Sequence, residues 1–443
     1  MSESTYQEAL NYLYSLTQSG IKLGLKNTGL LLQYFGEPQL HGRTIHIAGT
    51  NGKGSTAAMI ESILTTAGYK VGLYTSPHLL DFRERVQINR KLIKKHHTVE
   101  LITRIRSAVK ELNIAITFFE FTTVLAFLHF KEQQTDINVI EVGLGGRLDA
   151  TNLCQADISI ITSIAHDHTQ YLGEKLEQIA FEKASIIKSH GTVIANITEG
   201  KALKVVEDLA TKHSAQLYNL GVDFQVSLDT SENNNNTFSF TWNELALKNL
   251  KLPLKGYFQR ENSSLALSAC LQLKKNGLKI EDQHLREGLE KVSWPGRLEV
   301  IFTQPTVVLD CAHNEASVRN MTIELRKNFT FSRCFIVLGI MKDKNIDDVL
   351  KILSQLGDQF YLVPVNPPRG EDPVKLAEKL NHYNKSSQIF SNVSKALYAV
   401  KQIAQQNDLV CVTGSIYLVA AAKKCFNDET IFFNPRSAPR LNQ

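Results

Sequence analysis

Residues 47–55 have the sequence Ile-Ala-Gly-Thr-Asn-Gly-Lys-Gly-Ser, and this stretch decides the fold of the first half of the chain. The apolar segment Thr44–Ala48 is predicted to be a strand, and a helix is predicted from about Ser55 to Ala67. Glycines let backbone N–H groups turn toward an anion, and the helix N-terminus adds a favourable dipole. The stretch therefore predicts a phosphate-binding loop, in which Lys53 reaches nucleotide phosphates and Ser55 or Thr56 holds Mg²⁺.

The loop departs from the strict Gly-x-x-x-x-Gly-Lys-Ser/Thr pattern. Ile47 occupies the first glycine position, and Gly54 separates Lys53 from Ser55. The alternative interpretation is a glycine-rich turn that carries an exposed lysine, but the flanking strand and helix favour phosphate binding. The Gly-Leu-Gly-Gly stretch at residues 143–146 is a weaker signal, because Leu148 stands where a dinucleotide-binding fingerprint would need its last glycine.

Short apolar strands alternate with amphipathic helices along most of the chain, which is typical of a parallel α/β sheet. Further strands are predicted at Lys70–Tyr74, Ile137–Val142, Ile158–Ile164 and Val193–Ile197. Phe224–Leu228 and Thr237–Trp242 alternate apolar and polar residues and predict a hairpin, with Asn233–Asn236 in its loop.

The dipeptide Pro295-Gly296 marks a turn, after which the α/β alternation starts again. Strands are predicted at Thr306–Leu309, Cys334–Gly339, Gln359–Val363 and Leu409–Val412, and helices at Glu315–Lys327, Ile346–Leu356 and Pro373–Leu380. The predicted fold is α/β with two domains. Residues 1–293 form a P-loop-type mononucleotide-binding domain with a mainly parallel sheet, and residues 294–443 form a smaller Rossmann-like α/β domain.

Composition excludes several classes of protein. Hydrophobic residues make up 43% of the 443 residues and charged residues 21%, which is an ordinary globular mixture. A formal net charge of only +5 does not suggest a protein that coats nucleic acid. The N-terminal stretch Met1–Leu16 is polar and lacks the pattern of a signal peptide, and no apolar run is long enough to predict a membrane span. The six cysteines form no Cys-x-x-Cys pair, which suits a reducing, cytoplasmic environment rather than a disulfide or zinc scaffold.

Polar residues follow three of the predicted strands, where open α/β sheets bind ligands. Ser76 follows one strand, Glu141 ends a second, and His166-Asp167-His168 follows a third. His166 and His168 are expected to share a face of an extended chain. Oxygen and nitrogen ligands gathered beside a phosphate loop suit Mg²⁺ bound to nucleotide phosphates, whereas each residue alone could simply be a polar strand end.

Lys183 lies in an amphipathic segment in which Ile179, Ile186 and Ile187 are expected to form one helix face. This pattern predicts a partly buried lysine, although a surface lysine is the ordinary outcome for such a helix. Reaction of its neutral amine with CO₂ would give a carbamate, an anion that is able to bind Mg²⁺.

Several long motifs occur in order over nearly the whole chain. They are Gly-Thr-Asn-Gly-Lys-Gly-Ser (Gly49–Ser55), Ser-Pro-His-Leu (Ser76–Leu79), Glu-Val-Gly-Leu-Gly-Gly-Arg-Leu-Asp-Ala-Thr-Asn (Glu141–Asn152), Asp-His-Thr-Gln-Tyr-Leu-Gly (Asp167–Gly173), Trp-Pro-Gly-Arg-Leu-Glu (Trp294–Glu299) and Leu-Asp-Cys-Ala-His-Asn (Leu309–Asn314). Together they resemble the bacterial bifunctional dihydrofolate synthase/folylpolyglutamate synthases of the Mur ligase superfamily.

The resemblance implies a role for each matching residue. The ATP-binding residues would be Gly49, Thr50, Asn51, Gly52, Lys53, Gly54, Ser55, Gln259, Asn262, Arg297 and Asp310. The Mg²⁺ ligands would be Ser76, Glu141 and His168, with two metal sites expected and a carbamylated Lys183 beside them. The folate site would contain Arg85, Thr117, Phe119, Asp149 and Ala150, and the glutamate site His313, Ser415 and Tyr417. Lys53, Lys183 and His313 would be the catalytic residues, with His313 a candidate base.

The resemblance further implies an ATP-dependent ligase that joins L-glutamate to dihydropteroate and to reduced folates through an acyl phosphate. Its partners would be these small molecules, without nucleic acid or membrane, and the enzyme would be a monomer in the cytoplasm. Asp149-Ala150 favours the bifunctional enzyme over folylpolyglutamate synthase alone. A peptidoglycan-precursor ligase would need an additional domain before the first strand, and a regulatory nucleotide-binding protein would be expected to have lost Lys53, Glu141 or His168.

Overall fold

The computed structural model describes residues 3–20, 24–228, 237–365, 369–428 and 431. The chain packs into two compact units. The first consists of residues 1–165, 169–253 and 259–293, and the second of residues 166–168, 254–258 and 294–443.

The first unit contains an eight-stranded sheet with the order β4-β3-β2-β5-β1-β6-β7-β8. Its strands are β1 (Arg43–Ala48), β2 (Val71–Tyr74), β3 (Val86–Ile88), β4 (Lys91–Leu92), β5 (Ile137–Glu141), β6 (Ile158–Ile161), β7 (Thr192–Ala195) and β8 (Gln216–Asn219). The six strands from β2 to β8 in this order are parallel, and only β3 and β4 at one edge are antiparallel. The predicted mainly parallel sheet is therefore confirmed.

Central strands of this sheet are buried along their whole length, which explains their nearly continuous apolar sequences. Strand β6 is shorter than predicted, because residues 162–164 leave the sheet and turn toward the phosphate loop. The predicted hairpin is also present: β9 (Phe224–Leu228) and β10 (Thr237–Trp242) pair antiparallel, and β11 (Leu245–Lys251) completes a separate three-stranded sheet. The asparagine run predicted for its loop, residues 233–236, lies outside the described residues.

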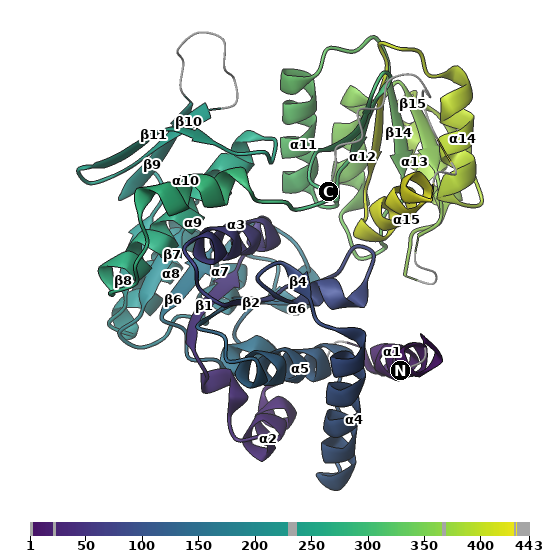
Figure 1. Ribbon diagram of the computed structural model, residues 1–443. Helices are drawn as coiled ribbons and strands as arrows, with labels where there is room; N and C mark the ends of the chain where they lie inside the picture. The colour runs from purple at the N-terminus through teal and green to yellow at the C-terminus, as the bar shows by residue number, and fades with distance from the viewer. Residues whose placement is uncertain (1–2, 21–23, 229–236, 366–368, 429–430, 432–443) are drawn as a thin grey trace. The chain divides into compact units, whose positions relative to one another are not determined.

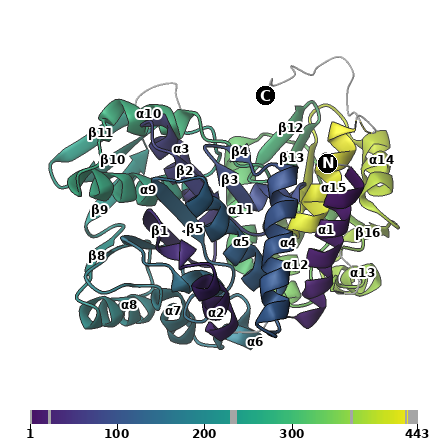
Figure 2. The ribbon, with the colours of Figure 1, turned by 60° about the horizontal axis from the view of Figure 1, so that its bottom comes forward.

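Helices cover both faces of the large sheet, with α3 and α5 on opposite sides (Figure 1). The helices of this unit are α1 (Glu3–Ser15), α2 (Lys26–Tyr34), α3 (Lys53–Thr66), α4 (Lys95–Glu111), α5 (Phe118–Glu132), α6 (Thr169–Leu172), α7 (Leu176–Ala184), α8 (Gly200–Lys212), α9 (Tyr257–Lys275), of which residues 257 and 258 belong to the second unit, and α10 (Asp282–Glu290). On the face of α5, the helices α1, α2, α4 and α5 bury a shared apolar core, and α1 lies beside α4 (Figure 2).

The second unit has a six-stranded sheet with the order β12-β13-β17-β14-β15-β16. Its strands are β12 (Glu299–Thr303), β13 (Thr306–Leu309), β14 (Cys334–Leu338), β15 (Gln359–Leu362), β16 (Ser386–Ile389) and β17 (Leu409–Thr413), of which only β12 is antiparallel. Its helices are α11 (Glu315–Asn328), α12 (Ile346–Leu356), α13 (Pro373–Asn381), α14 (Val393–Ile403) and α15 (Ile416–Asn427).

Local sequence explains these helices well. In α12, buried Ile346, Val349, Leu350 and Leu353 follow the spacing of one helical face, and the Asn345 side chain caps the first turn. In α13, Asp372 is the N-cap and Pro373 occupies the first helical position, where a missing N–H costs nothing.

Candidate active site

The phosphate loop connects β1 to α3 at the carboxyl edge of the parallel sheet. Helix α3 begins at Lys53, two residues earlier than the sequence predicts, so Ser55 lies in its first turn. Gly49 must be a glycine, because a Cβ atom there would lie 1.9 Å from Thr162 Oγ1. Gly52 has φ of 89° and a Cβ there would lie 2.4 Å from Asn262 Oδ1. Both glycines therefore allow close approach of neighbouring side chains.

Hydrogen bonds from the residues after β6 hold the loop. Thr50 N donates to Ser163 O at 2.9 Å, Asn51 N donates to Ser163 Oγ at 3.0 Å, and Thr162 Oγ1 donates to Asn51 O at 2.6 Å. Lys53 is half-buried rather than exposed, and its Nζ donates to Gly49 O at 3.0 Å and to Thr50 O at 3.2 Å. These hydrogen bonds hold the loop in one conformation at the N-terminus of α3, a position that favours an anion.

Helix α9 brings Gln259 and Asn262 to this loop. Gln259 Nε2 donates to Ser55 Oγ at 3.3 Å, and Asn262 Nδ2 donates to Gln259 Oε1 at 3.0 Å. Both side chains are buried, and Asn262 packs against Gly52. Residues separated by some 200 positions in the sequence (204 for Gln259 and Ser55) therefore lie at one site.

Ser76 and Glu141 are also brought together, because β2 and β5 are neighbours in the sheet. Ser76 N donates to Glu141 Oε2 at 3.0 Å, and the Glu141 side chain is buried. A serine hydroxyl and a carboxylate are hard oxygen donors that suit Mg²⁺ or Mn²⁺. Among the described residues, no group of three or more His, Cys, Asp or Glu side chains is arranged to hold a metal by itself, so a metal at this edge would need ligands besides Ser76 and Glu141.

Lys183 is more buried than its sequence predicts, with 4% of its surface exposed. Helix α7 ends at Ala184, so Ile186 and Ile187 lie beyond the helix and the predicted apolar face is wrong in this detail. Lys183 Nζ donates to Gly49 O at 3.0 Å, which places its amino group at the start of the phosphate loop.

The residues predicted for the folate site form two groups in the first unit. Arg85 is buried, donates from Nε to His78 Nδ1 at 2.8 Å, and lies 5.1 Å from the centre of the Phe118 ring. Burial and the neighbouring Arg85 lower the pKa of His78 to about 4. This ring is therefore neutral at pH 7 and is able to accept the hydrogen bond.

In the second group, Phe119 and Asp149 contact Gly143. Phe119 lies against this glycine, since a Cβ atom at Gly143 would be 2.4 Å from the ring. Thr117 is the N-cap of α5 and forms a capping box with Glu120. Asp149 and Ala150 are buried at the start of the short helix η4 (Ala150–Leu153).

In the second unit, Asp310 follows β13 and is buried. Its carboxylate accepts hydrogen bonds from Leu298 N and Ala312 N, both at 2.8 Å. Burial raises the pKa of Asp310, while the charge of Arg297 and these hydrogen bonds oppose the increase. Ser415 caps α15 and is buried, whereas Tyr417 in the same turn is 42% exposed.

His313 and Asp167 form a polar cluster with Lys344 in the second unit. His313 Nδ1 lies 2.9 Å from Cys311 O and its Nε2 lies 3.6 Å from Asp167 Oδ2, while Lys344 Nζ contacts Asp167 Oδ1 at 2.6 Å. Burial alone would raise the pKa of Asp167, but the neighbouring His313, His168 and Lys344 hold it well below its usual range. His168 packs in the same unit, within 3.7 Å of Asp343.

One expectation for this segment is wrong. His168 has φ of 51°, in the left-handed region, so the chain is not extended there and His166 and His168 do not share a face in the predicted way.

Sequence reasoning did not identify His78 or Lys344 as candidate site residues. His78 lies in the motif Ser76–Leu79, and its position directly after Pro77 is the local feature that could have indicated it. Lys344 lies in the polar stretch Lys342-Asp343-Lys344 after β14, and nothing local distinguishes it from a surface lysine, although only 7% of its side chain is exposed.

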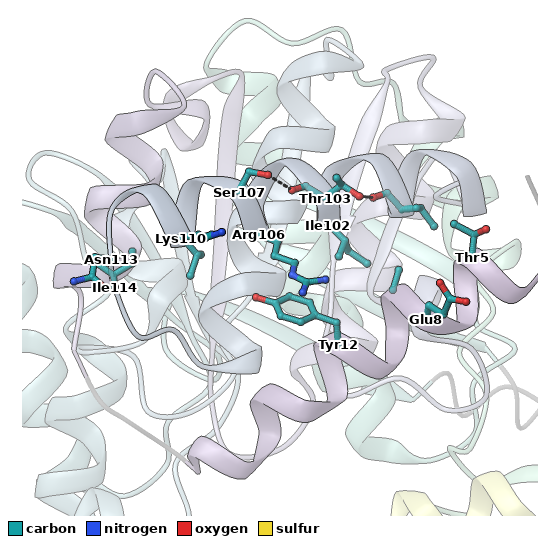
Figure 3. Close-up of a pocket in the computed structure, with 13 residues that line it drawn as sticks. Thr5, Glu8, Tyr12, Ile102, Thr103, Arg106, Ser107, Lys110, Asn113 and Ile114 are labelled. Atoms are coloured by element: carbon teal, nitrogen blue, oxygen red, sulfur yellow. Dashed lines mark hydrogen bonds between the residues drawn. The ribbon is translucent and has the colours of Figure 1, made fainter.

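A groove of about 710 Å³ lies apart from these residues, between α1 and α4 (Figure 3). Arg106 lies 4.6 Å from the centre of the Tyr12 ring, and Thr103 and Ser107 face the groove from α4. None of the predicted site residues lines this groove, so the groove is separate from the predicted phosphate-binding edge.

No helix in the described part of the chain combines the length and the apolar character that a membrane span requires.

Comparison with known protein families finds two matching domains in this chain. Residues 47–270 match the Mur ligase middle domain, and residues 296–416 match the Mur ligase glutamate ligase domain. The dihydrofolate synthase/folylpolyglutamate synthase of Bacillus subtilis is 34% identical over 428 residues, which cover 95% of this chain and 99% of that protein.

Solved structures show the same fold. FolC of Escherichia coli in complex with DHPP and ADP superimposes with a TM-score of 0.87 at 34% identity, over 96% of this chain and 98% of that chain. A bifunctional folylpolyglutamate synthase/dihydrofolate synthase with Mn, AMPPNP and L-glutamate bound has a TM-score of 0.84 at 33% identity, over 95% and 98% of the two chains.

An α/β fold of two units with a phosphate loop, together with both domain matches, defines an ATP-dependent ligase of the Mur ligase class. Within this class, the chain belongs to the dihydrofolate synthase/folylpolyglutamate synthase family. It is therefore an ATP-dependent glutamate ligase, and its relatives bind adenine nucleotides and a divalent metal.

Proposed function

We propose that this chain attaches L-glutamate to two acids, dihydropteroate and a reduced folate, after ATP has converted each acid to an acyl phosphate. A carboxylate resists attack by an amine, because the attack adds electron density to an anion. Phosphorylation makes the carbon electrophilic and provides phosphate as the leaving group. The amine nitrogen of glutamate then forms the amide bond, the carbon–oxygen bond to phosphate breaks, and the amine proton passes to a base.

The observation that carries this proposal is the joint placement of Lys53, Ser55 and Gln259 at one preformed loop. We assign Gly49 to Ser55 to the phosphates of ATP, with Lys53 stabilising the charge that develops in phosphoryl transfer. We assign Ser76 and Glu141 to the metal, together with His168. A bound Mg²⁺ would neutralise phosphate charge and orient the transferred group.

In the second unit we assign Arg297 and Asp310 to the nucleotide, and His313, Ser415 and Tyr417 to glutamate. The contact between His313 Nδ1 and Cys311 O supports a role for His313 as the base. Because Nδ1–H donates a hydrogen bond to that carbonyl, Nε2 is the basic nitrogen. The Asp167 carboxylate, 3.6 Å from Nε2, would stabilise the imidazolium that forms.

Lys183 is proposed to carry a carbamate. A carbamylated Nζ keeps one N–H group, so it retains the hydrogen bond to Gly49 O while its new carboxylate becomes available to a cation. Burial of the side chain supports this proposal, because a lysine is rarely buried unless its amino group has a specific partner.

The dual specificity rests on the region around Gly143, with Thr117, Phe119, Asp149 and Ala150 on the pterin side of the site. ADP release should be measured with dihydropteroate and with tetrahydrofolate, each with and without L-glutamate. We expect release with either acid only when L-glutamate is present. If tetrahydrofolate with L-glutamate gives ADP release and dihydropteroate with L-glutamate does not, the function is folylpolyglutamate synthase only. ADP release in the absence of either acid would contradict the proposal.

The domain boundary near residue 293, a monomeric state and a cytoplasmic location complete the proposal. Sedimentation of the purified protein at several concentrations tests the monomer, since a concentration-dependent increase in mass would overturn it.

A further inference from the structure

His46 is a polar residue in the middle of a buried strand. It lies in β1 between Ile45 and Ile47, and none of its surface is exposed. Burial lowers the pKa of His46 well below its usual value, with a smaller contribution from Lys188, so the ring is neutral. A neutral, buried imidazole normally forms at least one hydrogen bond.

Its partner is Thr151 in η4. His46 Nε2 lies 2.8 Å from Thr151 Oγ1, and Thr151 Oγ1 in turn donates to Asp149 Oδ1. The hydroxyl proton is directed to the carboxylate, so Thr151 Oγ1 must accept a hydrogen bond from His46 Nε2–H. His46 Nδ1, which has no hydrogen-bond partner in the described structure, is then the lone-pair nitrogen. The opposite tautomer would bury an N–H group without a partner, which is the costlier arrangement.

Asp149 uses its whole carboxylate within the protein. Oδ1 accepts hydrogen bonds from Thr151 Oγ1 and, at 3.0 Å, from Thr151 N. Oδ2 accepts hydrogen bonds from Gly143 N at 3.0 Å and Leu144 N at 2.9 Å. A carboxylate has about four acceptor positions, and all four are occupied. With 4% of its surface exposed, Asp149 has no oxygen left to offer to a ligand.

We propose that His46, Thr151 and Asp149 form a relay of hydrogen bonds that positions the backbone of Gly143 and Leu144, and that Asp149 acts on folate only through this backbone. All three are positioning residues. The identity of the substrate rests on the proposed function. The hydrogen bonds of the relay do not depend on that function.

The loop that the relay holds lies between two parts of the candidate site. Glu141 ends β5 two residues before Gly143, and the Phe119 ring packs directly on Gly143. The phosphate loop, in contrast, is held by Thr162 and Ser163. Because different hydrogen bonds hold the two loops, loss of the relay should weaken binding of the acid substrate and leave binding of ATP nearly unchanged.

Thr151→Val tests this inference, since it removes the hydroxyl and keeps the shape of the side chain. We expect the KM for dihydropteroate to rise about tenfold, which is the effect of one lost buried hydrogen bond, while the KM for ATP changes less than about twofold. Thr151→Ser should restore the wild-type value. His46→Leu should behave like Thr151→Val, and His46→Gln should be close to wild type, because its amide N–H reaches a similar position.

Thr44→Val is the matched control. Thr44 is 1% exposed in the same strand, two residues from His46, and its hydroxyl has no hydrogen-bond partner among the described residues. Both KM values of this variant should stay at the wild-type level. Equal kinetics for Thr151→Val and Thr44→Val would overturn the inference.

Hydrogen exchange of the Gly143 and Leu144 amides provides a readout that needs no substrate. Exchange should become at least about tenfold faster in Thr151→Val and His46→Leu, and stay slow in Thr151→Ser and Thr44→Val. Unchanged exchange in Thr151→Val would refute the relay. Faster exchange without a change in the KM for dihydropteroate would refute its role in positioning. A wild-type enzyme that rejects dihydropteroate would instead contradict the proposed function, and the exchange result would still decide whether the relay exists.

Discussion

Lys183 Nζ donates a hydrogen bond to the carbonyl oxygen of Gly49 at 3.0 Å, which joins helix α7 to the first residue of the phosphate loop. The lysine is buried, so this contact is not a chance encounter of a mobile surface side chain. Under the proposed assignment of this loop to ATP phosphates, a change in the charge of the amine would change the binding of the nucleotide.

Replacement of Lys183 separates a carbamate from a simple cation. Lys183→Ala should lose at least about 100-fold in turnover, and Lys183→Arg should not recover it, because guanidinium stays protonated and does not react with CO₂. Acetate at high concentration should partly restore Lys183→Ala by filling the vacated anion position. Steady-state ADP release measures all three effects.

Lys188→Arg is the control for this series. Lys188 only donates hydrogen bonds, to Asn152 O and Oδ1 at 2.8 Å, so an arginine should keep activity within about threefold. An active Lys183→Arg enzyme would exclude the carbamate.

Lys53→Ala should abolish turnover with little loss of stability. The ammonium group is expected to stabilise transferred charge, so its removal should cost at least about 100-fold in kcat. Its two hydrogen bonds to loop carbonyls contribute only about 1 kcal/mol each, and the thermal midpoint should fall by no more than about 4 °C. Kinetics and calorimetry on one sample check both statements. Near-normal turnover in this variant would remove Lys53 from the phosphate site.

Gly143→Ala should displace Phe119. The added methyl group would lie 2.4 Å from the ring, so the ring has to move and the KM for dihydropteroate should rise about tenfold. Phe119→Leu in the same chain should relieve the clash, because the smaller side chain leaves room for the added methyl group. Gly200→Ala is a suitable control, because nothing lies within 4 Å of the added methyl group. A Gly143→Ala enzyme with unchanged KM would show that Phe119 does not line the pterin site.

His129 makes stability depend on pH. Burial, together with the charges of His97 and Lys70, lowers the pKa of His129 to about 3 in the folded chain, whereas an unfolded histidine titrates near 6.5. Below about pH 6.5 the unfolded state binds the extra proton, so the free energy of unfolding falls as pH falls, by roughly 2 kcal/mol between pH 6.5 and 4.5. His129→Gln should remove this share of the pH dependence, as measured by urea denaturation. The exposed His382→Gln should leave it in place, and identical slopes for His129→Gln and wild type would contradict the assignment.

Much of the fold could be predicted from the sequence, because its strands are buried on both faces and their apolar runs are continuous. The strands from Thr44 and from Ile137 are correct to within a residue or two, and helix α12 is correct at both ends. Strands β3, β4 and β12 are short or lie at a sheet edge, and were not predicted. Such strands carry a weak alternation of polar and apolar residues that does not stand out locally.

The candidate site, like the fold, is predicted only in part by local sequence. Glycine spacing and strand ends predict the phosphate loop, Ser76 and Glu141 from local sequence. Gln259 and Asn262 have no local signal and were identified only through the resemblance to a family. The burial of Lys183 and the saturation of the Asp149 carboxylate depend on contacts across the fold, which local patterns do not contain.

The contact between Asp167 and Lys344 has a consequence for synthesis of the chain. The two residues are 177 positions apart, and each side chain is more than nine-tenths buried. At about 5–20 residues per second, a ribosome needs on the order of ten to thirty seconds to deliver Lys344 after Asp167 has been made. All eight strands of the first sheet end by Asn219 and can pair during that interval, whereas the segment at residues 166–168 has to wait without its cation. The nascent chain therefore carries the Asp167 carboxylate without Lys344 until the second unit emerges.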